Sequence, residues 1–227
     1  MKNLNSRKTL FALYPDLGAP NARVQFGDTF QDTGASGSTY SGNRDILPGC
    51  VFVTGGISED PAGIISGTSG GSSDQLLYSF GNRLRSSAGI YLPSDTSERV
   101  WIGFTDASSF SGHLSSSTPV LNYVAFRYST GASDVAWKAV TDNGSGTPTI
   151  VSTGVSVSTT KTQFLGISWD RTASVARFFI DGSIVAEICS TLPAVSIALR
   201  YVAGVLQLTS GVRKLHLSSI QIHQSTC

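Results

Sequence analysis

The stretch Gln163–Cys189, QFLGISWDRTASVARFFIDGSIVAEIC, decides the fold class. Its apolar residues alternate in three successive runs: Leu165, Ile167 and Trp169; Ala176, Phe178 and Ile180; Ile184, Ala186 and Ile188. Alternation with a period of two is typical of β-strands. Asp181-Gly182 separates the last two runs, and Asp-Gly in this position is a strong hairpin signal. The stretch therefore predicts a three-stranded antiparallel meander at the centre of an all-β domain.

Similar short runs, bounded by turn residues, recur through most of the chain. Glu98–Thr105 alternates, and we expect its Trp101 to face away from the core side. In Val212–Gln224 the apolar positions change from odd to even, which predicts a β-bulge at Ser218-Ser219. Gly55–Ser73 is predicted to be a long Gly/Ser loop. No segment has convincing helical periodicity, so the pattern favours a β-sandwich or jelly roll.

The chain divides into two regions by composition. Residues 1–45 are poor in regular pattern and partly small and polar, and we predict an extended N-terminal arm with at most a short strand. Residues 46–227 hold the alternating runs and are predicted to form one antiparallel β-sandwich domain. A length of 227 residues is sufficient for such a core.

Charge is sparse in this sequence. Only 14% of the residues are charged and the formal net charge is +1, with no Lys/Arg run, so we expect no nucleic-acid partner. Low charge also suits a surface that packs against other subunits. No apolar stretch is long enough for a signal-peptide core or a membrane span, so we expect synthesis in a cytoplasm and no membrane partner.

Motifs for catalysis are weak. Gly67-Thr68-Ser69-Gly70-Gly71 matches G-x-S-x-G, but no strand–turn–helix unit surrounds it, and we interpret it as a loop. The three glutamates form no acidic pair on a strand, which a glycosidase could use. Four aspartates fall at turns, where we expect local backbone bonding: Asp134, Asp142, Asp170 and Asp181.

Metal-binding patterns are weak as well. The three histidines, His113, His216 and His223, show no ligand spacing. The three cysteines show none either, and Cys189 is predicted to be a small buried residue at a strand end. We therefore expect that the protein binds no metal and no cofactor and that it is not an enzyme.

Aromatic and arginine side chains on outward faces are the better functional candidates. Trp101, Tyr123 and Phe179 are predicted to point away from the core, and Arg127 and Arg177 share their registers. An aromatic ring beside a guanidinium can bind a sugar or anchor a protein interface. The alternative, which we favour at this stage, is that a second sheet or a neighbouring subunit buries these residues.

The meander resembles the concanavalin A-like lectin/glucanase superfamily, which includes laminin-G-like domains. The resemblance lies in Trp169-Asp170 and in the run Phe178-Phe179-Ile180-Asp181-Gly182, and it extends over Ile46–Gln224. It implies a jelly roll. Glucanases of this family carry a Glu-x-Asp-x-x-Glu strand that this sequence lacks, so the resemblance does not carry hydrolase activity over.

The low charge, the many Gly, Ser and Thr residues and the extended N-terminal arm also resemble those of virion proteins of tailed bacteriophages. That resemblance implies a non-enzymatic virion structural protein, first of all a capsid-decorating or cementing subunit. The alternative is a carbohydrate-binding, receptor-binding module of a tail or fibre, and a glycan hydrolase ranks third. The implied partners are the major capsid protein, fibre or tail subunits, further copies in a homo-oligomer, and a cell-surface glycan. The implied location is the virion.

Overall fold

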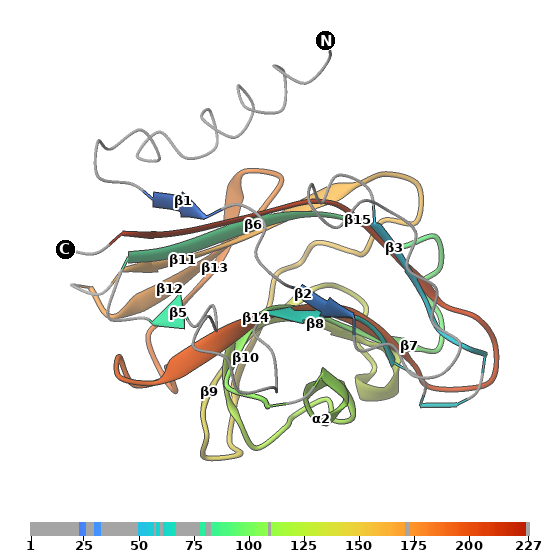
Figure 1. Cartoon of the computed structure of the whole chain (residues 1–227), viewed down its shortest axis with the longest axis horizontal. Coiled ribbons are helices and arrows are strands. Elements are labelled where there is room, and N and C mark those ends of the chain that lie inside the picture. Colours follow the sequence, from blue (N-terminus) through green and yellow to red (C-terminus); the bar gives the residue numbers. More distant parts are fainter. Residues whose placement is uncertain are drawn as a thin grey trace, which may run out of the picture.

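The computed structural model describes residues 23–25, 30–32, 50–56, 58–59, 61–66, 78–79, 83–108, 110–170 and 173–225. These residues form two antiparallel sheets stacked face to face (Figure 1), so the predicted β-sandwich is confirmed. Sheet A contains, in spatial order, β1 (Arg23–Gln25), β15 (Lys214–Ser225), β6 (Arg83–Tyr91), β11 (Gln163–Asp170), β12 (Val175–Ile180) and β13 (Ser183–Ile188), with β3 (Cys50–Val53) also paired to β15.

Sheet B lies beneath sheet A and carries the helices on its far side (Figure 1). Its order is β10 (Thr149–Ser152), β9 (Lys138–Asn143), β8 (Asn122–Ser129), β7 (Glu98–Thr105), β14 (Ala198–Gln207), β4 (Pro61–Ser66) and β2 (Phe30–Asp32), with β5 (Tyr78–Ser79) also paired to β14. The described helices are α2 (Phe110–Leu114) and the 3-10 turn η2 (Thr130–Ala132). None of them is long and apolar enough to cross a bilayer.

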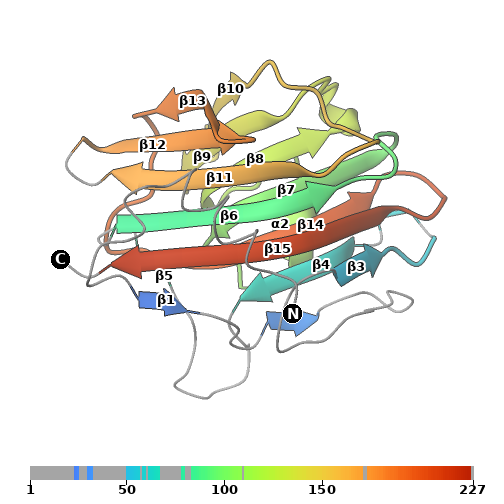
Figure 2. The same cartoon turned by 90° about the horizontal axis from the view of Figure 1, so that it is seen from above.

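The predicted meander is present as β11, β12 and β13, which lie side by side in Figure 2. Asp181 and Gly182 both have positive φ, 50° and 85°, as a two-residue hairpin of this kind requires. The Asp181 carboxylate also accepts a hydrogen bond from the Phe164 amide at 2.8 Å. The turn is therefore fixed to β11 as well as to its own strands.

The bulge in the last strand is confirmed too. Pairing between β15 and β6 shifts by one residue between Leu217 and Ser219, so the apolar side chains on both sides of the shift face the core. His216 and His223 consequently point outward from sheet A, as predicted. His216 packs its ring edge-to-face with Tyr91 at 5.1 Å between centroids.

The main core fills the space between the sheets. Phe126 of sheet B meets Phe178 of sheet A edge-to-face with 5.2 Å between ring centroids, which ties the two sheets together. Val100, Ile102 and Phe104 face the same core from β7. A second buried cluster lies on the opposite face of sheet B, around Trp101, and is described below.

The structure differs from the sequence-based expectations in three details. β4 lies within the stretch predicted as a Gly/Ser loop, and its apolar residues pair with β14. α2 was not predicted, because five residues are too few for a helical period. Cys189 is exposed and not buried, since it follows the last residue of β13 at a sheet edge. Of the predicted arm, only β1 and β2 belong to the described residues; the rest of 1–45 lies outside them.

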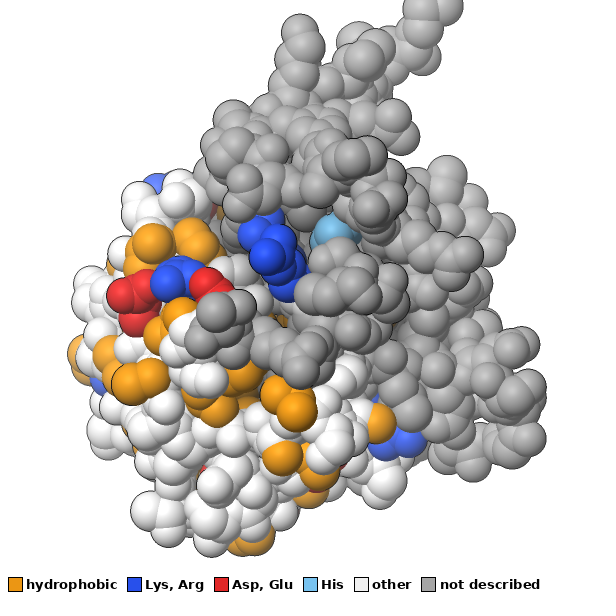
Figure 3. Space-filling model, turned by 90° about the vertical axis from the view of Figure 1, so that its left-hand side faces the viewer, with side chains coloured by type: hydrophobic (Ala, Val, Ile, Leu, Met, Phe, Trp, Pro, Cys, Tyr) orange, Lys and Arg blue, Asp and Glu red, His pale blue; other side chains and the backbone are white. Residues whose placement is uncertain are grey.

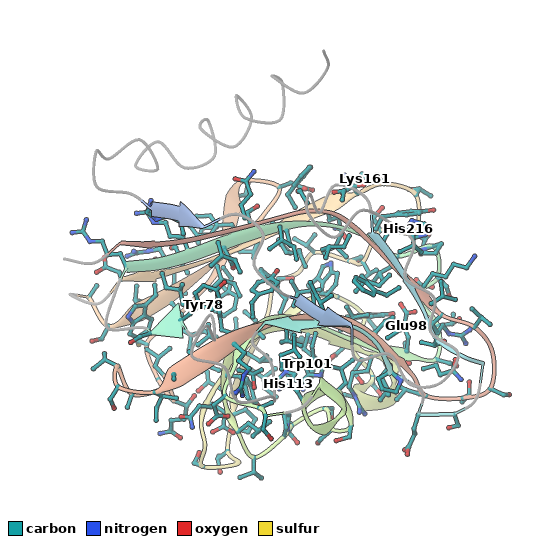
Figure 4. All side chains as sticks on the ribbon, viewed as in Figure 1. Tyr78, Glu98, Trp101, His113, Lys161 and His216 are labelled. Carbon is teal, nitrogen blue, oxygen red and sulfur yellow. The ribbon has the colours of Figure 1, made fainter. Side chains whose placement is uncertain are left out.

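Glu98 is a buried acidic residue at one end of the sandwich (Figure 4). Its side chain is fully buried, and its two carboxyl oxygens have no hydrogen-bond partner among the described residues. Its neighbour Gln207 on β14 is bonded to Thr54 instead. Burial raises the pKa of Glu98 to about 8, with Arg213 opposing the shift and Asp95 adding to it.

This raised pKa predicts a stability that falls as pH rises. Between pH 4.5 and about 8 the unfolded chain releases the Glu98 proton while the folded protein retains it, so increasing pH favours unfolding. Glu98→Gln removes the titration. We expect the unfolding free energy of the variant, relative to wild type, to increase steadily from pH 5 to pH 8 in urea titrations. Glu187→Gln, at an exposed position of β13, controls for the loss of one carboxylate, and parallel curves for Glu98→Gln and wild type would contradict the prediction.

Candidate functional site

The outer face of sheet B, which points away from sheet A, gathers three of the five predicted site residues. Trp101 projects from β7 and Tyr123 and Arg127 from β8, all at alternate positions of paired strands. The pairing places Trp101 opposite Arg127 and Tyr123 opposite Thr105. All three side chains are buried, although neither a second sheet nor a neighbouring subunit, the covers named in the favoured alternative, buries them. What buries them is a segment of the same chain.

Gly103 and Ala125 form the floor between the two aromatic residues. They are opposite each other on β7 and β8. A Cβ atom on Gly103 would lie 2.5 Å from the Ala125 Cα, so only glycine allows the strands to approach here. The small side chains of this pair leave room above the sheet, and the rings of Trp101 and Tyr123 meet across it.

The segment that covers this face joins β7 to β8 and includes α2; its described residues are 106–108 and 110–121, and we call it the covering segment. Its ends are closed at the base, where the Asp106 carboxylate accepts hydrogen bonds from the Asn122 amide nitrogen at 3.0 Å and from the side-chain Nδ2 at 2.7 Å. Its Leu114 side chain is fully buried in the cluster around Trp101. The covering segment therefore packs directly on the outer face of sheet B.

Trp101 and Tyr123 of the sheet and His113 of the covering segment form a compact aromatic trio; Figure 4 labels Trp101 and His113, which lie close together. Ring centroids are 4.5 Å apart for Trp101–His113, 5.4 Å for Trp101–Tyr123 and 5.7 Å for His113–Tyr123, all edge-to-face. His113 comes from α2, and it is fully buried. Burial lowers the pKa of His113 to about 3, so this ring is neutral at physiological pH.

The polar atoms of this trio are not satisfied by the protein. Trp101 Nε1, Tyr123 Oη, both ring nitrogens of His113 and Oδ2 of the adjacent Asp142 are buried without a hydrogen-bond partner among the described residues. Burial and the Asp142 carboxylate together raise the pKa of Tyr123. Each unpaired buried group costs about 1–3 kcal/mol. Such a concentration on one face is unusual for a core that serves stability alone.

Three arginines of sheet B bind the backbone of the covering segment. Arg99 donates to the Leu114 carbonyl at 2.9 Å, Arg127 to the Ser117 carbonyl at 2.6 Å, and Arg200 to the Ala107 carbonyl at 2.8 Å. They come from β7, β8 and β14, so the bonds are distributed along the whole segment. Sheet B thus contacts the covering segment through guanidinium groups, where an ordinary hydrophobic core would use apolar side chains.

Arg127 is also half of a buried ion pair. Its Nε and Nη2 bind the two carboxylate oxygens of Asp134 at 3.0 and 3.1 Å, a bidentate geometry. Asp134 additionally accepts the Ser129 amide at 3.0 Å. This aspartate was predicted to bond locally at a turn, and it does so while neutralising Arg127. The pair fixes the end of β8 to the following turn.

Arg177 and Phe179 are not part of this site. They lie on β12, on the outer face of sheet A and therefore on the opposite side of the sandwich. Arg177 is partly exposed and pairs with Glu187 at 2.6 Å and Asp170 at 3.4 Å. Phe179 is half-buried. Figure 3, a view of one end of the sandwich, shows a small group of acidic and basic side chains at its left edge, beside hydrophobic ones.

An open hollow lies at the edge of the covering segment. It has a volume of about 410 Å³ and is lined by small and hydroxyl-bearing residues of the segment itself, including Ser108, Ser115 and Thr118. This volume is within the range of small-molecule pockets. Its lining contains no aromatic ring and no charged side chain. None of the three aromatic residues of the trio lines this hollow.

The remaining sequence motifs add no second site. The G-x-S-x-G stretch at 67–71 lies outside the described residues. Within the part of the chain that is described, no three His, Cys, Asp or Glu side chains come close enough to hold a metal ion. Sequence reasoning missed four members of the site: His113, Asp142, Arg99 and Arg200. Alternation in β7 and β9 could have indicated Arg99 and Asp142, whereas His113 lies in a polar stretch without a period.

Comparison with solved structures identifies the fold. The chain superimposes on the Crh5 transglycosylase with a TM-score of 0.59 and 13% identity, over 92% of this chain and 85% of that one. It matches the carbohydrate recognition domain of Emp47p with a TM-score of 0.58 and 8% identity, over 92% and 97%. It also matches a sialidase at 0.55 and 9%, over 89% of this chain but only 17% of the sialidase. No protein-family model and no curated protein sequence matches.

The fold is therefore a concanavalin A-like sandwich, as the resemblance of the meander implied. These matches also overturn one expectation. The sequence-based prediction that the chain is not an enzyme rested on a missing Glu-x-Asp-x-x-Glu strand, yet the same architecture is found in a transglycosylase. The fold is shared by proteins that bind carbohydrates and by proteins that process them. The prediction of a non-enzymatic protein is accordingly withdrawn.

His113 should make the folded protein sensitive to acid. Its pKa is about 3 in the folded state and about 6.5 when exposed, so below pH 6.5 the unfolded chain takes up a proton that the folded protein resists. Stability is then lost as pH falls from 6.5 toward 3. His113→Leu removes this loss and two unpartnered nitrogens, and we expect its stability advantage to grow as pH decreases.

Urea unfolding between pH 7 and pH 4 measures this effect. His216→Leu, which removes a partly exposed histidine from the outer face of sheet A, is the matched control. An advantage of His113→Leu that does not change with pH would mean that solvent already reaches the ring.

The two arginine ion pairs should differ greatly in energetic weight. Asp134→Ala leaves the Arg127 guanidinium buried and unpaired, and loss of one partner of such a pair costs about 3–5 kcal/mol. Glu187→Ala breaks an exposed pair of Arg177, where about 0–1 kcal/mol is usual. Chemical denaturation of both variants tests the contrast. Equal losses would show that Arg127 finds another partner or moves into solvent.

Proposed function

We propose that this protein binds a carbohydrate on the outer face of sheet B. The observation that carries the proposal is the trio of Trp101, Tyr123 and His113, whose buried polar atoms have no hydrogen-bond partner among the described residues. A sugar offers a hydrocarbon face that packs on aromatic rings and hydroxyl groups that pair with N–H, O–H and imidazole groups. Trp101 and Tyr123, which stand on the strands of the sheet, supply both kinds of contact, and His113 belongs to the segment that covers them.

The fold supports the same reading. Proteins of this architecture include a domain named for carbohydrate recognition and a transglycosylase. The face with its rings and partnerless polar atoms is on β7 and β8, in the middle of the larger described sheet, where paired strands hold the side chains rigidly. Rigid placement of a few polar groups in an apolar surround is typical of small-molecule sites.

We further propose a more specific role, that of a receptor-binding module in the tail or fibre of a bacteriophage. In this role the carbohydrate ligand is a glycan on the host cell surface. The predicted capsid-decorating role, the virion location, the capsid, tail or fibre partners and the homo-oligomer stay predictions. The absence of a nucleic-acid or membrane partner is a prediction of the same standing.

Conservative substitutions test the proposal. Tyr123→Phe keeps the ring and removes one hydroxyl, and one neutral hydrogen bond contributes about 0.5–1.5 kcal/mol, or about two- to tenfold in affinity. We expect this loss for a glycan selected on an array with the purified protein and measured by calorimetry. Trp101→Phe should weaken binding further, because it shortens the ring system and removes Nε1. Thermal denaturation verifies that both variants fold.

Phe179→Ala serves as the control, since Phe179 is an aromatic residue on the opposite side of the sandwich. Loss of binding in Phe179→Ala with full binding in Trp101→Phe and Tyr123→Phe would place the site on sheet A and refute the proposal. The selected glycan is also incubated with the wild-type protein and assayed for new reducing ends. Their release would identify a hydrolytic site, and binding without release would identify a lectin.

A further inference from the structure

The guanidinium groups of Arg99 and Arg200 are paired with weak acceptors. Arg99 binds the Leu114 carbonyl and the Ser129 hydroxyl, and Arg200 binds the Ala107 carbonyl. Neither forms an ion pair among the described residues. Burial lowers the pKa of Arg99, the neighbouring Arg127 adds to this shift, and the Glu59 carboxylate opposes it without forming an ion pair. A carboxylate in the place of these carbonyls would make charge-assisted bonds, which are about twice as strong as neutral ones.

The strands beneath the covering segment carry a clear excess of positive charge. Alternation along β7, β8, β9 and β14 puts the following charged side chains on the outer face: Arg99, Arg127, Lys138, Asp142 and Arg200. Asp134 from the turn after β8 neutralises Arg127. The chain as a whole has a formal charge of only +1, so this face is locally distinct. A planar guanidinium matches the geometry of a carboxylate.

The covering segment is held to sheet B by buried side chains and by polar bonds. Its base is fixed by Asp106 and Asn122, and its body by the buried side chains of His113, Leu114 and Pro119 and by the arginine–carbonyl bonds. Lifting the body returns the polar atoms of Trp101, Tyr123 and His113 to water, so the cost of opening is partly offset. Connecting loops are among the parts of a fold that open locally at the lowest free energy.

From these observations we propose that the covering segment is a lid over a binding site for a carboxylated glycan, with Arg99 and Arg200 binding the ligand's carboxylates after the lid lifts. This inference rests on the proposed function and specifies its ligand and its control. The backbone carbonyls of the lid occupy the guanidinium groups in the closed state. Trp101 then receives the sugar ring, and the ligand binds only the open fraction of the protein.

Leu114→Ala tests the lid by weakening its packing on the cluster around Trp101, while all proposed ligand contacts on the sheet stay in place. It raises the open fraction and should tighten the apparent affinity at least tenfold, because apparent affinity scales with the competent fraction. Hydrogen exchange provides a ligand-free readout. Amides of 110–117 should exchange faster in Leu114→Ala than in wild type, while amides of β8 remain unchanged.

A disulfide provides the opposite perturbation. A Cβ on Gly146 would lie 3.8 Å from the Val120 Cβ, which is the usual separation in a disulfide. The double variant Val120→Cys with Gly146→Cys therefore ties the lid to the turn after β9. Oxidised, it should bind at least tenfold more weakly than wild type, and a reductant should restore binding. Gly146→Cys alone controls for the positive φ of 74° at this position.

The probes are hexamers of galacturonate and mannuronate and short hyaluronan chains, each with its methyl ester, in which the carboxylate charge is lost. The acids should bind at least tenfold more tightly than the esters. Arg200→Gln should reduce this acid-to-ester ratio at least tenfold, even though it also loosens the lid, because only the acid uses the charge. Calorimetry at constant ionic strength measures all affinities.

These outcomes distinguish failure of the lid or of the carboxylate preference from failure of carbohydrate binding itself. Unchanged affinity in both Leu114→Ala and the oxidised double variant would overturn the lid while leaving glycan binding in place. Equal affinity for acids and esters would overturn the charge preference. No binding of any glycan by any variant, Leu114→Ala included, would refute the proposed function as well, and the exchange data would then show independently whether the segment opens.

Discussion

All eight residues of β7, Glu98–Thr105, are buried, and this double burial is the constraint on which the rest of the structure depends. A strand in the middle of a sheet can be buried on both faces only if each face has a cover. Sheet A covers the face of Val100 and Phe104, with apolar side chains from both sheets. The covering segment covers the face of Trp101, and it must do so with sixteen residues that include one short helix.

The two covers solve this problem in different ways. Between the sheets, contacts such as Phe126–Phe178 are apolar and fill the core densely. Outside sheet B, the joint combines buried apolar side chains such as Leu114 with arginine–carbonyl bonds and several polar atoms that have no hydrogen-bond partner among the described residues. A cover that served stability alone would replace His113 with an aliphatic residue and gain free energy. The polar joint is therefore best explained by a demand other than stability.

The sequence carried enough information for the sandwich and for part of the site. Alternation in Glu98–Thr105 and its neighbour placed Trp101, Tyr123 and Arg127 on one face, and the Asp181-Gly182 turn fixed the meander. The cover could not be predicted, because a five-residue helix has no measurable period and His113 lies among serines and glycines. Register between distant strands, which brings Arg200 of β14 to the same face, is set by tertiary packing.

The prediction of a non-enzymatic protein failed for a related reason. The missing Glu-x-Asp-x-x-Glu strand excludes one catalytic arrangement, but it does not exclude every catalytic arrangement that this fold can carry. Whatever chemistry the protein performs, the charges of sheet B constrain its ligand. Arg127 is neutralised by Asp134 through two short bonds and is committed to structure. Arg99 and Arg200 lie at opposite ends of the paired strands β7 and β14, and each donates to a backbone carbonyl of the covering segment. Among the described residues both guanidinium groups donate to neutral oxygens, those of two backbone carbonyls and, for Arg99, the Ser129 hydroxyl, and a ligand carboxylate would make stronger, charge-assisted bonds.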